Sequence, residues 1–239
     1  MIKLYQFKPF WGLPNASPFC MKAETYLRYR GIEFEAVACN PRQSPSGQIP
    51  FVNIEEPTGL KTITDSEKII AYFESSQDEP MDRGLSARQR ALSYLIRNEV
   101  EDELYWQITY MRWGDPQGWV VFLPDLKKHM QGFKGSFLPL IIRRMLLRQM
   151  SRRGMNPENT EASYAAGIQL LDMLSDLLGK QAFFLGKEIR TLDMSVYAFL
   201  ANIIDQPHLN LIQQHAKSLD NLMAYCERIK QLIWKDWQA

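Results

Sequence analysis

One stretch has the spacing of a C-x-x-C redox motif, with serine in place of the first cysteine: Ser17-Pro18-Phe19-Cys20. Ser17 is a favoured helix N-cap and Pro18 a favoured first helical residue, so the stretch is expected to start a helix. The free N–H groups of a helix start stabilise a nearby thiolate. A serine hydroxyl cannot exchange disulfides, but it can donate a hydrogen bond to a thiolate on another molecule. The alternative is that Ser17 only caps the helix, a contribution of about 1 kcal/mol.

Cys20 lies one turn inside this helix, at the place of the second cysteine of the redox motif. Without a first cysteine it has no partner in the motif, so we interpret it as a core residue. A monothiol that forms a mixed disulfide with a small thiol is the sharper alternative. The chain has two further cysteines, Cys39 and Cys226, and all three are widely spaced. This number and spacing do not suit a disulfide scaffold, and they fit a protein of a reducing compartment. No cysteine and histidine share a metal-ligand spacing, so no metal site is expected.

Two further segments could bind a ligand through their backbone. Ile49-Pro50 precedes a predicted strand, and a cis X-Pro bond costs only about 0.5–1 kcal/mol. A cis bond would expose the Ile49 backbone to an extended peptide; a trans proline that starts a strand is the alternative. Asp65-Ser66 opens a predicted helix whose N–H groups could take a carboxylate. Residues 64–67 (T-D-S-E) also fit a capping box, and the two interpretations of this segment are compatible.

Trp11 belongs to the loop 11–15 (W-G-L-P-N), which comes immediately before the predicted helix start. Such a loop would overhang a thiol site at Ser17. The indole could form one wall of an apolar substrate pocket, or it could pack on the second half of the chain. The residues themselves do not rank these two interpretations.

The elements that must position these residues alternate over the first 76 residues. β-Branched and aromatic content predicts strands at 2–7 and 34–39 and a hairpin over 51–64, whose E-P-T-G turn suits type I. Helices are predicted at 17–30, which Gly31 ends, and at 65–76. A β-α-β unit implies a parallel pair, and the hairpin adds an antiparallel one. We therefore predict a mixed four-stranded sheet in a thioredoxin-like arrangement.

The rest of the chain is predicted to be all-helical. Residues 77–86 are polar, contain Pro and Gly, and are interpreted as a linker. A long helix is expected over 87–112, with the inner stripe Leu92, Leu95, Ile96, Val100, Leu104 and Ile108. Further helices are expected at 119–130, 136–151, 158–178, 191–205 and 216–234. The fold class is thus α+β, with domains at 1–76 and 87–239.

This arrangement and three motifs resemble the glutathione transferase superfamily. The stretch "SPFCMKAETYLRYRGIEFE" resembles the first helix of the transferases that use serine, "SGQIPFV" their cis-proline segment, and "ITDSEKIIAYFE" their acidic-serine helix start. The three occur in the expected order and spacing, and the similarity covers most of the chain. The segments "WGLPNASPFCMKAETYLR" and "YCERI" resemble the branch that holds the failed-axon-connections and metaxin proteins.

The resemblance implies roles for these residues. Ser17 would stabilise the thiolate of glutathione for attack on a small electrophile, and the Ile49-Pro50 backbone would hold its cysteinyl part. Asp65 and Ser66 would bind its γ-glutamyl end. The helical domain would bind the unnamed electrophile, and a homodimer is expected. The metaxin-like resemblance also implies an alternative, a non-catalytic binding or scaffold protein; a Cys20-dependent thiol transferase is a third.

The second domain departs from the family pattern at one helix start. The family usually has a proline, Ser or Thr, two residues and Asp after "FLG"; here "FLGKEIRTLDMS" offers Ile189, Arg190 and Asp193 at these places. Asp193 matches, but the cap position holds Arg190, and Thr191 is one place too late. We expect a weaker or shifted cap with no effect on activity.

Composition excludes several function classes. The chain has 28 Lys and Arg against 27 Asp and Glu, a net charge of +1, which argues against nucleic-acid binding by bulk charge. The N-terminus resembles neither a signal nor a transit peptide, and no apolar run approaches membrane-spanning length. A cytoplasmic protein is therefore expected. Segment 141–155 carries five arginines and no acid, so it is either a solvated helix face or a surface for an anionic partner or membrane: Arg143, Arg144, Arg148, Arg152 and Arg153.

Overall fold

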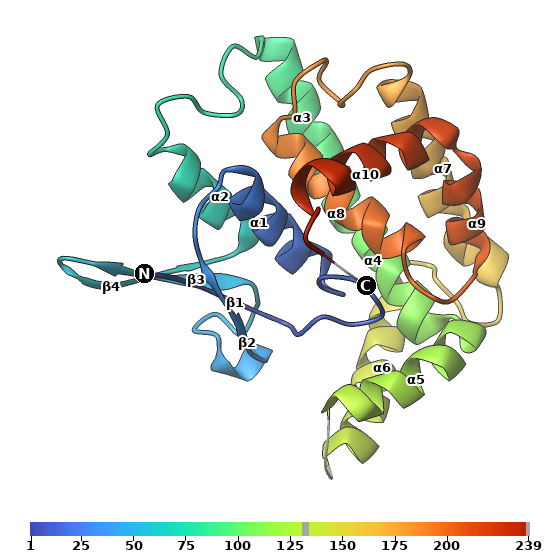
Figure 1. The fold of residues 1–239 in the computed structure, drawn as a ribbon. Helices are drawn as coiled ribbons and strands as arrows, with labels where there is room; N and C mark the ends of the chain where they lie inside the picture. Colours follow the sequence, from blue (N-terminus) through green and yellow to red (C-terminus); the bar gives the residue numbers. More distant parts are fainter. Residues whose placement is uncertain (131–133, 238–239) are drawn as a thin grey trace.

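The computed structural model describes residues 1–130 and 134–237, and its two parts lie side by side in Figure 1. A four-stranded sheet in the order β2-β1-β3-β4 forms the first part. Its strands are β1 Ile2–Gln6, β2 Glu35–Ala38, β3 Phe51–Glu56 and β4 Gly59–Thr64. β1 runs parallel to β2 and antiparallel to β3, and β3 and β4 form the predicted hairpin. The predicted mixed sheet is confirmed.

Two helices pack on this sheet, α1 Pro18–Tyr29 and α2 Ser66–Glu74. A short 3₁₀ turn, η1 Pro41–Gln43, follows β2. Leu4 of β1 and Val52 of β3 face each other in register, and both are fully buried. Met21 and Leu27 of α1 and Ile69 of α2 are buried in the same core. The alternation of apolar residues in the strands and the helical spacing in α1 and α2 thus meet in one core, which fixes where the two helix starts lie.

The long predicted helix over 87–112 is one helical run with two wider turns. It comprises α3 Ala87–Glu99, the π-helical η2 Val100–Leu104, α4 Tyr105–Thr109 and the π-helical η3 Tyr110–Gly114. Its buried residues Ile96, Val100, Leu104 and Ile108 recur at every fourth position, which exceeds the 3.6 residues of an α-helical turn. The π-helical turn η2 lies within this stripe, and its additional residue keeps the stripe on the core.

The prediction that Leu95 belongs to the inner stripe is wrong. Its side chain is 63% exposed, because it lies one residue, and therefore about 100° around the helix, from the buried Ile96. The next two helices, α5 Pro116–Met130 and α6 Lys134–Arg152, form an arm that extends downward from the rest of the helical domain in Figure 1. They match the predicted helices at 119–130 and 136–151 to within three residues.

The remaining helices are α7 Thr160–Leu178, α8 Thr191–Ile204, α9 Leu211–Ser218 and α10 Asp220–Ile233. The single helix predicted over 216–234 is wrong. Leu219 adopts a non-helical backbone between α9 and α10, and Asn210 caps α9 by accepting a hydrogen bond from Gln213 N–H. Every residue of α8 is buried, and α8 packs against α1 of the first domain. This contact places the start of α1 at the junction of the two domains.

Candidate functional site

Ser17 is the N-cap of α1, as its sequence context predicts. Its Oγ accepts a hydrogen bond from the backbone N–H of Cys20 at 3.4 Å, and its own N–H donates to Asn15 Oδ1 at 2.9 Å. Asn15 in turn donates to the carbonyl oxygen of Phe7, just beyond β1, at 2.8 Å. The side chain of Ser17 is half-buried. Since Oγ accepts from Cys20 N–H, the hydroxyl proton remains available to donate to another acceptor.

Cys20 is fully buried directly behind Ser17. Burial raises the pKa of its thiol to about 12, although the Ser17 hydroxyl and the Phe7 backbone lower that pKa by hydrogen bonding. A thiol with this pKa is almost entirely protonated near neutral pH, so it is a poor nucleophile. The geometry therefore favours a core role for Cys20 and argues against a Cys20-dependent thiol transferase.

The sheet brings the other two predicted segments together. The Ile49-Pro50 peptide bond is cis, as predicted from the sequence. Phe51 of β3 pairs with Thr64 of β4, so Pro50 and Asp65 are neighbours at the end of the hairpin, and Asp65 N–H donates to Pro50 O at 3.2 Å. Tyr5 of β1 is the register partner of Phe51 on the other side. The chain after β1, which leads to Ser17, thus leaves the sheet at the same edge.

Asp65 caps α2, which corrects the predicted capping box. Its carboxylate accepts from Glu67 N–H at 2.9 Å and Lys68 N–H at 3.2 Å, whereas the box assigned this role to Thr64. The backbone of Asp65 has φ 82° and ψ 132°, a region that residues other than glycine rarely adopt. Such strain persists where the surrounding structure imposes it, and it is concentrated at functional sites. Ser66 follows as the first helical residue and is 2% exposed.

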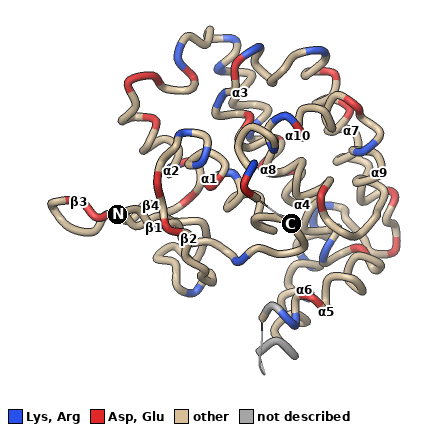
Figure 2. The backbone as a smooth tube through the Cα atoms, in the orientation of Figure 1, with Lys and Arg blue, Asp and Glu red and all other residues tan. Residues whose placement is uncertain are grey.

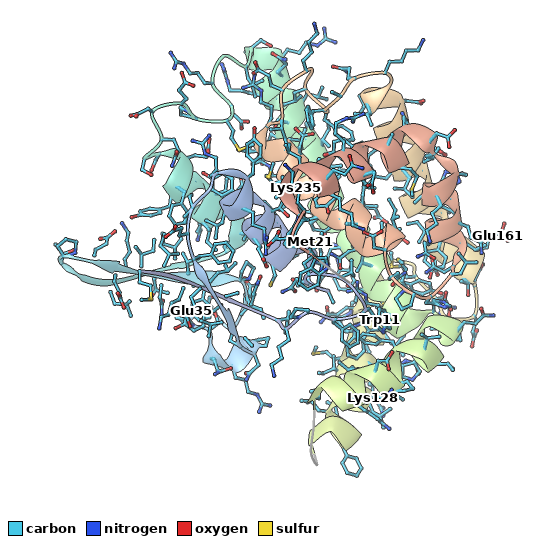
Figure 3. All side chains as sticks on the ribbon, in the orientation of Figure 1. Trp11, Met21, Glu35, Lys128, Glu161 and Lys235 are labelled. Carbon is cyan, nitrogen blue, oxygen red and sulfur yellow. The ribbon has the colours of Figure 1, made fainter. Side chains whose placement is uncertain are left out.

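Trp11 packs on the helical domain, the second of the two interpretations of its loop. Its Nε1–H donates to Asp125 Oδ2 of α5 at 2.9 Å, and its ring lies 5.2 Å from that of Phe122. Figure 3 shows Trp11 where this loop meets α5. Trp11 and Gly12 both have positive φ, 58° and 73°, and form a tight turn closed by two hydrogen bonds between Phe10 and Leu13. The turn anchors the loop before Ser17 to the second domain.

A buried ion network that sequence reasoning missed lies behind the start of α2. Lys22 of α1 is fully buried, and its Nζ donates to Glu67 Oε2 at 2.7 Å and to Glu101 Oε1 at 2.6 Å. Arg97 of α3 also pairs with Glu67. Burial raises the pKa of Glu67, but the charges of Lys22 and Arg97 outweigh it and lower that pKa overall. We call Lys22, Glu67, Arg97 and Glu101 the Lys22 network; its two cations and two anions join α1 and α2 to the helical domain.

A second buried cation, Arg112 of η3, contacts the residue before Ser17. Its Nη1 donates to the carbonyl oxygen of Ala16 at 2.5 Å and its Nη2 to Asn202 Oδ1 at 2.9 Å. Asn202 of α8 donates in turn to Asn15 O at 3.3 Å. Two side chains of the helical domain therefore hold the two carbonyl groups that precede Ser17. We call Arg112 and Asn202 the Arg112 clamp.

The Arg112 clamp differs from the Lys22 network in charge. Arg112 is 6% exposed, its Nε has no hydrogen-bond partner, and no carboxylate pairs with it in the described part of the chain. Burial lowers the pKa of its guanidinium to about 10. The only sequence signal for it was an arginine amid aromatic residues, "YMRWG", which does not distinguish a buried cation from a surface one.

The helix start with the missing family cap is α8, and Asp82 of the interdomain segment supplies the cap. Arg190 is the N-cap residue, as the sequence suggested, and its N–H donates to Asp193 Oδ2 at 2.8 Å. Asp82 accepts from Thr191 N–H at 3.1 Å and from its hydroxyl at 2.5 Å. Asp193 is fully buried, and burial raises its pKa to about 6. The expected weak cap is therefore reinforced by a residue more than 100 positions away in the sequence.

Across residues 1–130 and 134–237, no group of three or more His, Cys, Asp or Glu side chains is arranged to hold a metal ion. Over the same ranges, no helix has the length and apolar character needed to cross a bilayer.

The fold and site define a class of protein: a thioredoxin-like domain with a cis-proline and a serine at the start of its first helix, followed by an all-helical domain. Family models of the glutathione S-transferase N-terminal domain and the glutathione S-transferase C-terminal domain match residues 18–118 and 167–229. The chain belongs to the glutathione S-transferase family. The resemblance drawn from its motifs is confirmed.

Several known proteins are similar to this chain over nearly its whole length. The isoprene-epoxide–glutathione S-transferase of Rhodococcus sp. (strain AD45) is 32% identical over 97% of this chain and 98% of its own length. Failed axon connections of Drosophila melanogaster is 30% identical over 99% of this chain and 59% of its own, and mouse metaxin-1 is 29% identical over 98% and 75%. These relatives match the failed-axon-connections and metaxin branch inferred from the sequence.

Solved structures show the same architecture. The beta-etherase LigF of Sphingobium sp. strain SYK-6 superimposes with a TM-score of 0.64, over 98% of this chain and 97% of its own, at 18% identity. This similarity describes the fold.

Proposed function

We propose that this protein is a glutathione-dependent transferase in which Ser17 stabilises the glutathione thiolate. The carrying observation is the position of Ser17 Oγ, which caps α1 at the sheet edge where Ile49-Pro50 and Asp65-Ser66 also lie. The Ser17 hydroxyl and the neutral thiol of Cys20 form a weak hydrogen bond. A thiolate is a far stronger acceptor than a neutral thiol, so an incoming thiolate would draw this hydrogen bond to itself.

The other site residues would hold the rest of the tripeptide. The backbone of Ile49 would pair with the cysteinyl part of glutathione, like an added strand. Ser66 and the first N–H groups of α2 would receive the γ-glutamyl carboxylate. Asp65 would contribute to binding the ammonium group, since its carboxylate is exposed at the same helix start. The α1 start would lower the thiol pKa by its partial positive charge.

For the electrophile we propose an epoxide. The support is the printed name of the full-length Rhodococcus relative, which joins glutathione to isoprene epoxide. In this reaction the thiolate attacks one ring carbon, the C–O bond of that carbon breaks, and the alkoxide takes a proton from water. Phe19, next to Ser17, is half-buried and lies 5.7 Å from the ring of Tyr105, so these two side chains offer an apolar surface beside the thiol.

The decisive experiment combines calorimetric titration of glutathione with the ultraviolet absorbance of the bound thiolate as a function of pH. Wild type should bind glutathione with a lowered thiol pKa and conjugate an epoxide. Ser17→Ala should lose about tenfold or more in conjugation rate, the value of one hydrogen bond to a charged group. Ser17→Thr keeps the hydroxyl and should retain most activity.

Ser86→Ala is the matched control for capping. Ser86 caps α3 by accepting from Gln89 N–H at 3.2 Å, outside the site. Its loss should lower stability about as much as the loss of the Ser17 cap, by about 1 kcal/mol, without any change in the thiol pKa. If wild type neither binds glutathione nor conjugates epoxides, the transferase proposal fails.

A second candidate is a binding or scaffold protein that retains the fold without the reaction. The observation that favours it is the similarity over nearly the whole chain to Failed axon connections and metaxin-1, neither of which is named as a transferase. Glutathione binding without conjugation of any electrophile in a broad panel would support this candidate.

We also propose a cytoplasmic homodimer. Leu60 of β4 and Tyr94 and Leu95 of α3 are each more than 60% exposed, so both domains offer apolar surface to a second copy. Light scattering after size exclusion should give twice the chain mass. Leu95→Glu should reduce that mass to the monomer value, and an unchanged dimer would exclude Leu95 from the interface.

A further inference from the structure

The charges of the chain are strongly uneven along the sequence. Residues 126–157 contain eight Lys and Arg and no Asp or Glu, whereas the rest of the chain has 20 Lys and Arg against 27 Asp and Glu. This segment spans the second half of α5 and all of α6, the arm that extends from the helical domain (Figure 1). Figure 2 shows basic positions on this arm. A near-neutral protein thus carries its excess positive charge on one projecting element.

The arginines of α6 fall into two groups. Arg143 donates from Nε to Trp113 O at 2.9 Å and lies over the Trp119 ring, and Arg153 just beyond α6 pairs with both oxygens of Asp102. Arg144, Arg148 and Arg152 are exposed, and the described residues give none of them a hydrogen bond or an ion pair. The first group is occupied in packing the arm. The second is spaced by four residues and therefore forms one row on the outer face.

Apolar side chains share this outer face. Leu140, Ile141 and Met145 are 50%, 65% and 51% exposed. They precede or alternate with the three arginines along α6, so the face is apolar toward the start of the helix and basic toward its end. A shallow groove of about 700 Å³ runs along it, lined by Leu140, Arg143, Arg144, Leu147, Arg148, Ser151 and Arg152. Helices of this kind, with arginine beside large apolar residues, suit the interface of a lipid bilayer.

We propose that the outer face of α6, formed by Leu140, Ile141, Met145, Arg144, Arg148 and Arg152, binds the surface of an anionic lipid bilayer. An interfacial helix lies in the plane of the bilayer surface, with its apolar side chains about 5–10 Å deep at the boundary of headgroups and acyl chains. In this orientation Leu140, Ile141 and Met145 enter that boundary. The longer arginines reach the phosphates, which their planar guanidinium groups bind in bidentate fashion.

Two other occupants fit this face less well. In a symmetric pair of copies, α6 would meet α6, and the interface would contain six arginines without a carboxylate to balance them. An acidic protein or nucleic acid would satisfy the arginines, but its charged surface would leave Ile141 and Met145 without an apolar environment. Only a surface with phosphates above hydrocarbon accommodates both kinds of side chain at once.

The test is sedimentation of the full chain with vesicles of phosphatidylcholine alone or with about 30% phosphatidylserine. Wild type should sediment with the anionic vesicles, less so at high salt, and not with the neutral ones. Arg144→Gln/Arg148→Gln/Arg152→Gln should lower the partition coefficient by about a hundredfold, since each basic residue near such a surface contributes about fivefold. Ile141→Ser/Met145→Ser should also lower it with the charge unchanged.

The matched control is Lys180→Gln/Lys187→Gln/Lys217→Gln, which removes the same charge from exposed positions outside the arm. It should bind anionic vesicles like wild type. No sedimentation of wild type, or equal losses in the two triple variants, would overturn the proposal. A change in the molar mass from light scattering in the α6 triple variant would instead assign the face to a second copy, which also overturns it. None of these outcomes depends on glutathione.

Discussion

The Lys22 network and the Arg112 clamp each bury a cation at the domain junction, the first on α1 itself and the second at the residue before Ser17. Lys22 has two carboxylates within 2.7 Å, so its charge is balanced where it is buried. Arg112 donates only to a backbone carbonyl and a side-chain amide, both uncharged. A buried ion without a counter-ion is costly, so a fold that keeps one at its functional edge retains a positive potential there.

Because of this difference in charge balance, we expect the Lys22 network to contribute mainly to stability and the Arg112 clamp mainly to function. The Lys22 network satisfies itself and needs no ligand, so its loss should mainly affect folding. The Arg112 clamp holds the carbonyl groups of Asn15 and Ala16 in place and leaves a positive charge near the proposed thiolate. It should therefore contribute more to the glutathione site than to stability, and Arg112 acts as a positioning residue.

The largest effect is expected for Lys22→Met. This change leaves Glu67 and Glu101 facing each other without the buried ammonium, and breaking such a pair from one side costs about 3–5 kcal/mol. Urea denaturation should show this loss as a lower midpoint with an unchanged slope. Adding Glu101→Gln should restore part of the stability, because it removes one of the unbalanced charges. A loss below 1 kcal/mol in Lys22→Met would show that the network is not a stabilising contact.

Arg112→Gln should show the opposite pattern. The lost hydrogen bonds are offset by the removal of an unbalanced buried charge. The free energy of unfolding should therefore change by only about 1 kcal/mol. Glutathione conjugation should fall by about tenfold, and the bound thiol pKa, read from thiolate absorbance, should rise. Asn202→Ala is the control, since it loosens the clamp and keeps the charge. If Asn202→Ala raises the thiol pKa as much as Arg112→Gln does, the charge of Arg112 has no separate role.

Asp82→Ala tests how far the Lys22 network extends. Arg97 donates to Thr191 Oγ1 at 3.2 Å, and Thr191 donates to Asp82, so the contacts continue from α1 to the interdomain segment. Loss of this cap should cost about 1 kcal/mol by thermal or urea unfolding. Asp78→Ala, a nearby exposed acid with no hydrogen bond among the described residues, should change stability by less than half of that. Equal effects would mean that Asp82 acts only through the net charge.

The smallest effect is expected for Cys20, which lies on α1 between Ser17 and Lys22. Burial raises its pKa to about 12, against an ordinary value of about 8.5 in the unfolded chain. The thiol therefore favours the folded state fully below pH 8.5, and this contribution is lost as the pH rises from 8.5 toward 12. At pH 9 this loss is still less than about 1 kcal/mol. Between pH 7 and 9.5 the free energy of unfolding should fall less in Cys20→Ala than in wild type. If it falls in parallel in the two proteins, the Cys20 thiol is accessible to water in the folded state.

Local patterns in the sequence predicted much of the fold. The β-α-β order, the hairpin and the Ser17 cap depend on residues close together in the chain, and the cis-proline was predicted from its match to the family segment. The missed features depend on distant residues. The charge partners of Lys22 lie 45 and 79 positions away, and the cap of α8 comes from Asp82. No local pattern encodes these contacts.

Helical periodicity failed at two places. Leu95 was placed on the inner stripe although it lies about 100° around α3 from the buried Ile96. The helix predicted over 216–234 missed the break at Leu219, an apolar residue at which no glycine or proline marks an end. At Asp65 the pattern favoured Thr64 as the cap, because a positive φ at an aspartate cannot be read from residue types. The site's strained and charged positions were therefore the least predictable ones.

The two π turns have an evolutionary consequence. Glu101 lies in the first and Arg112 in the second, so the angular offset between the two charges depends on one additional residue in each turn. Deleting one residue from η2 would restore an α-helix and rotate everything that follows by about 100°. Glu101 would keep its place relative to α3 while Arg112 would leave Ala16. A one-residue length polymorphism in this helix would thus separate two lineages of the protein by function.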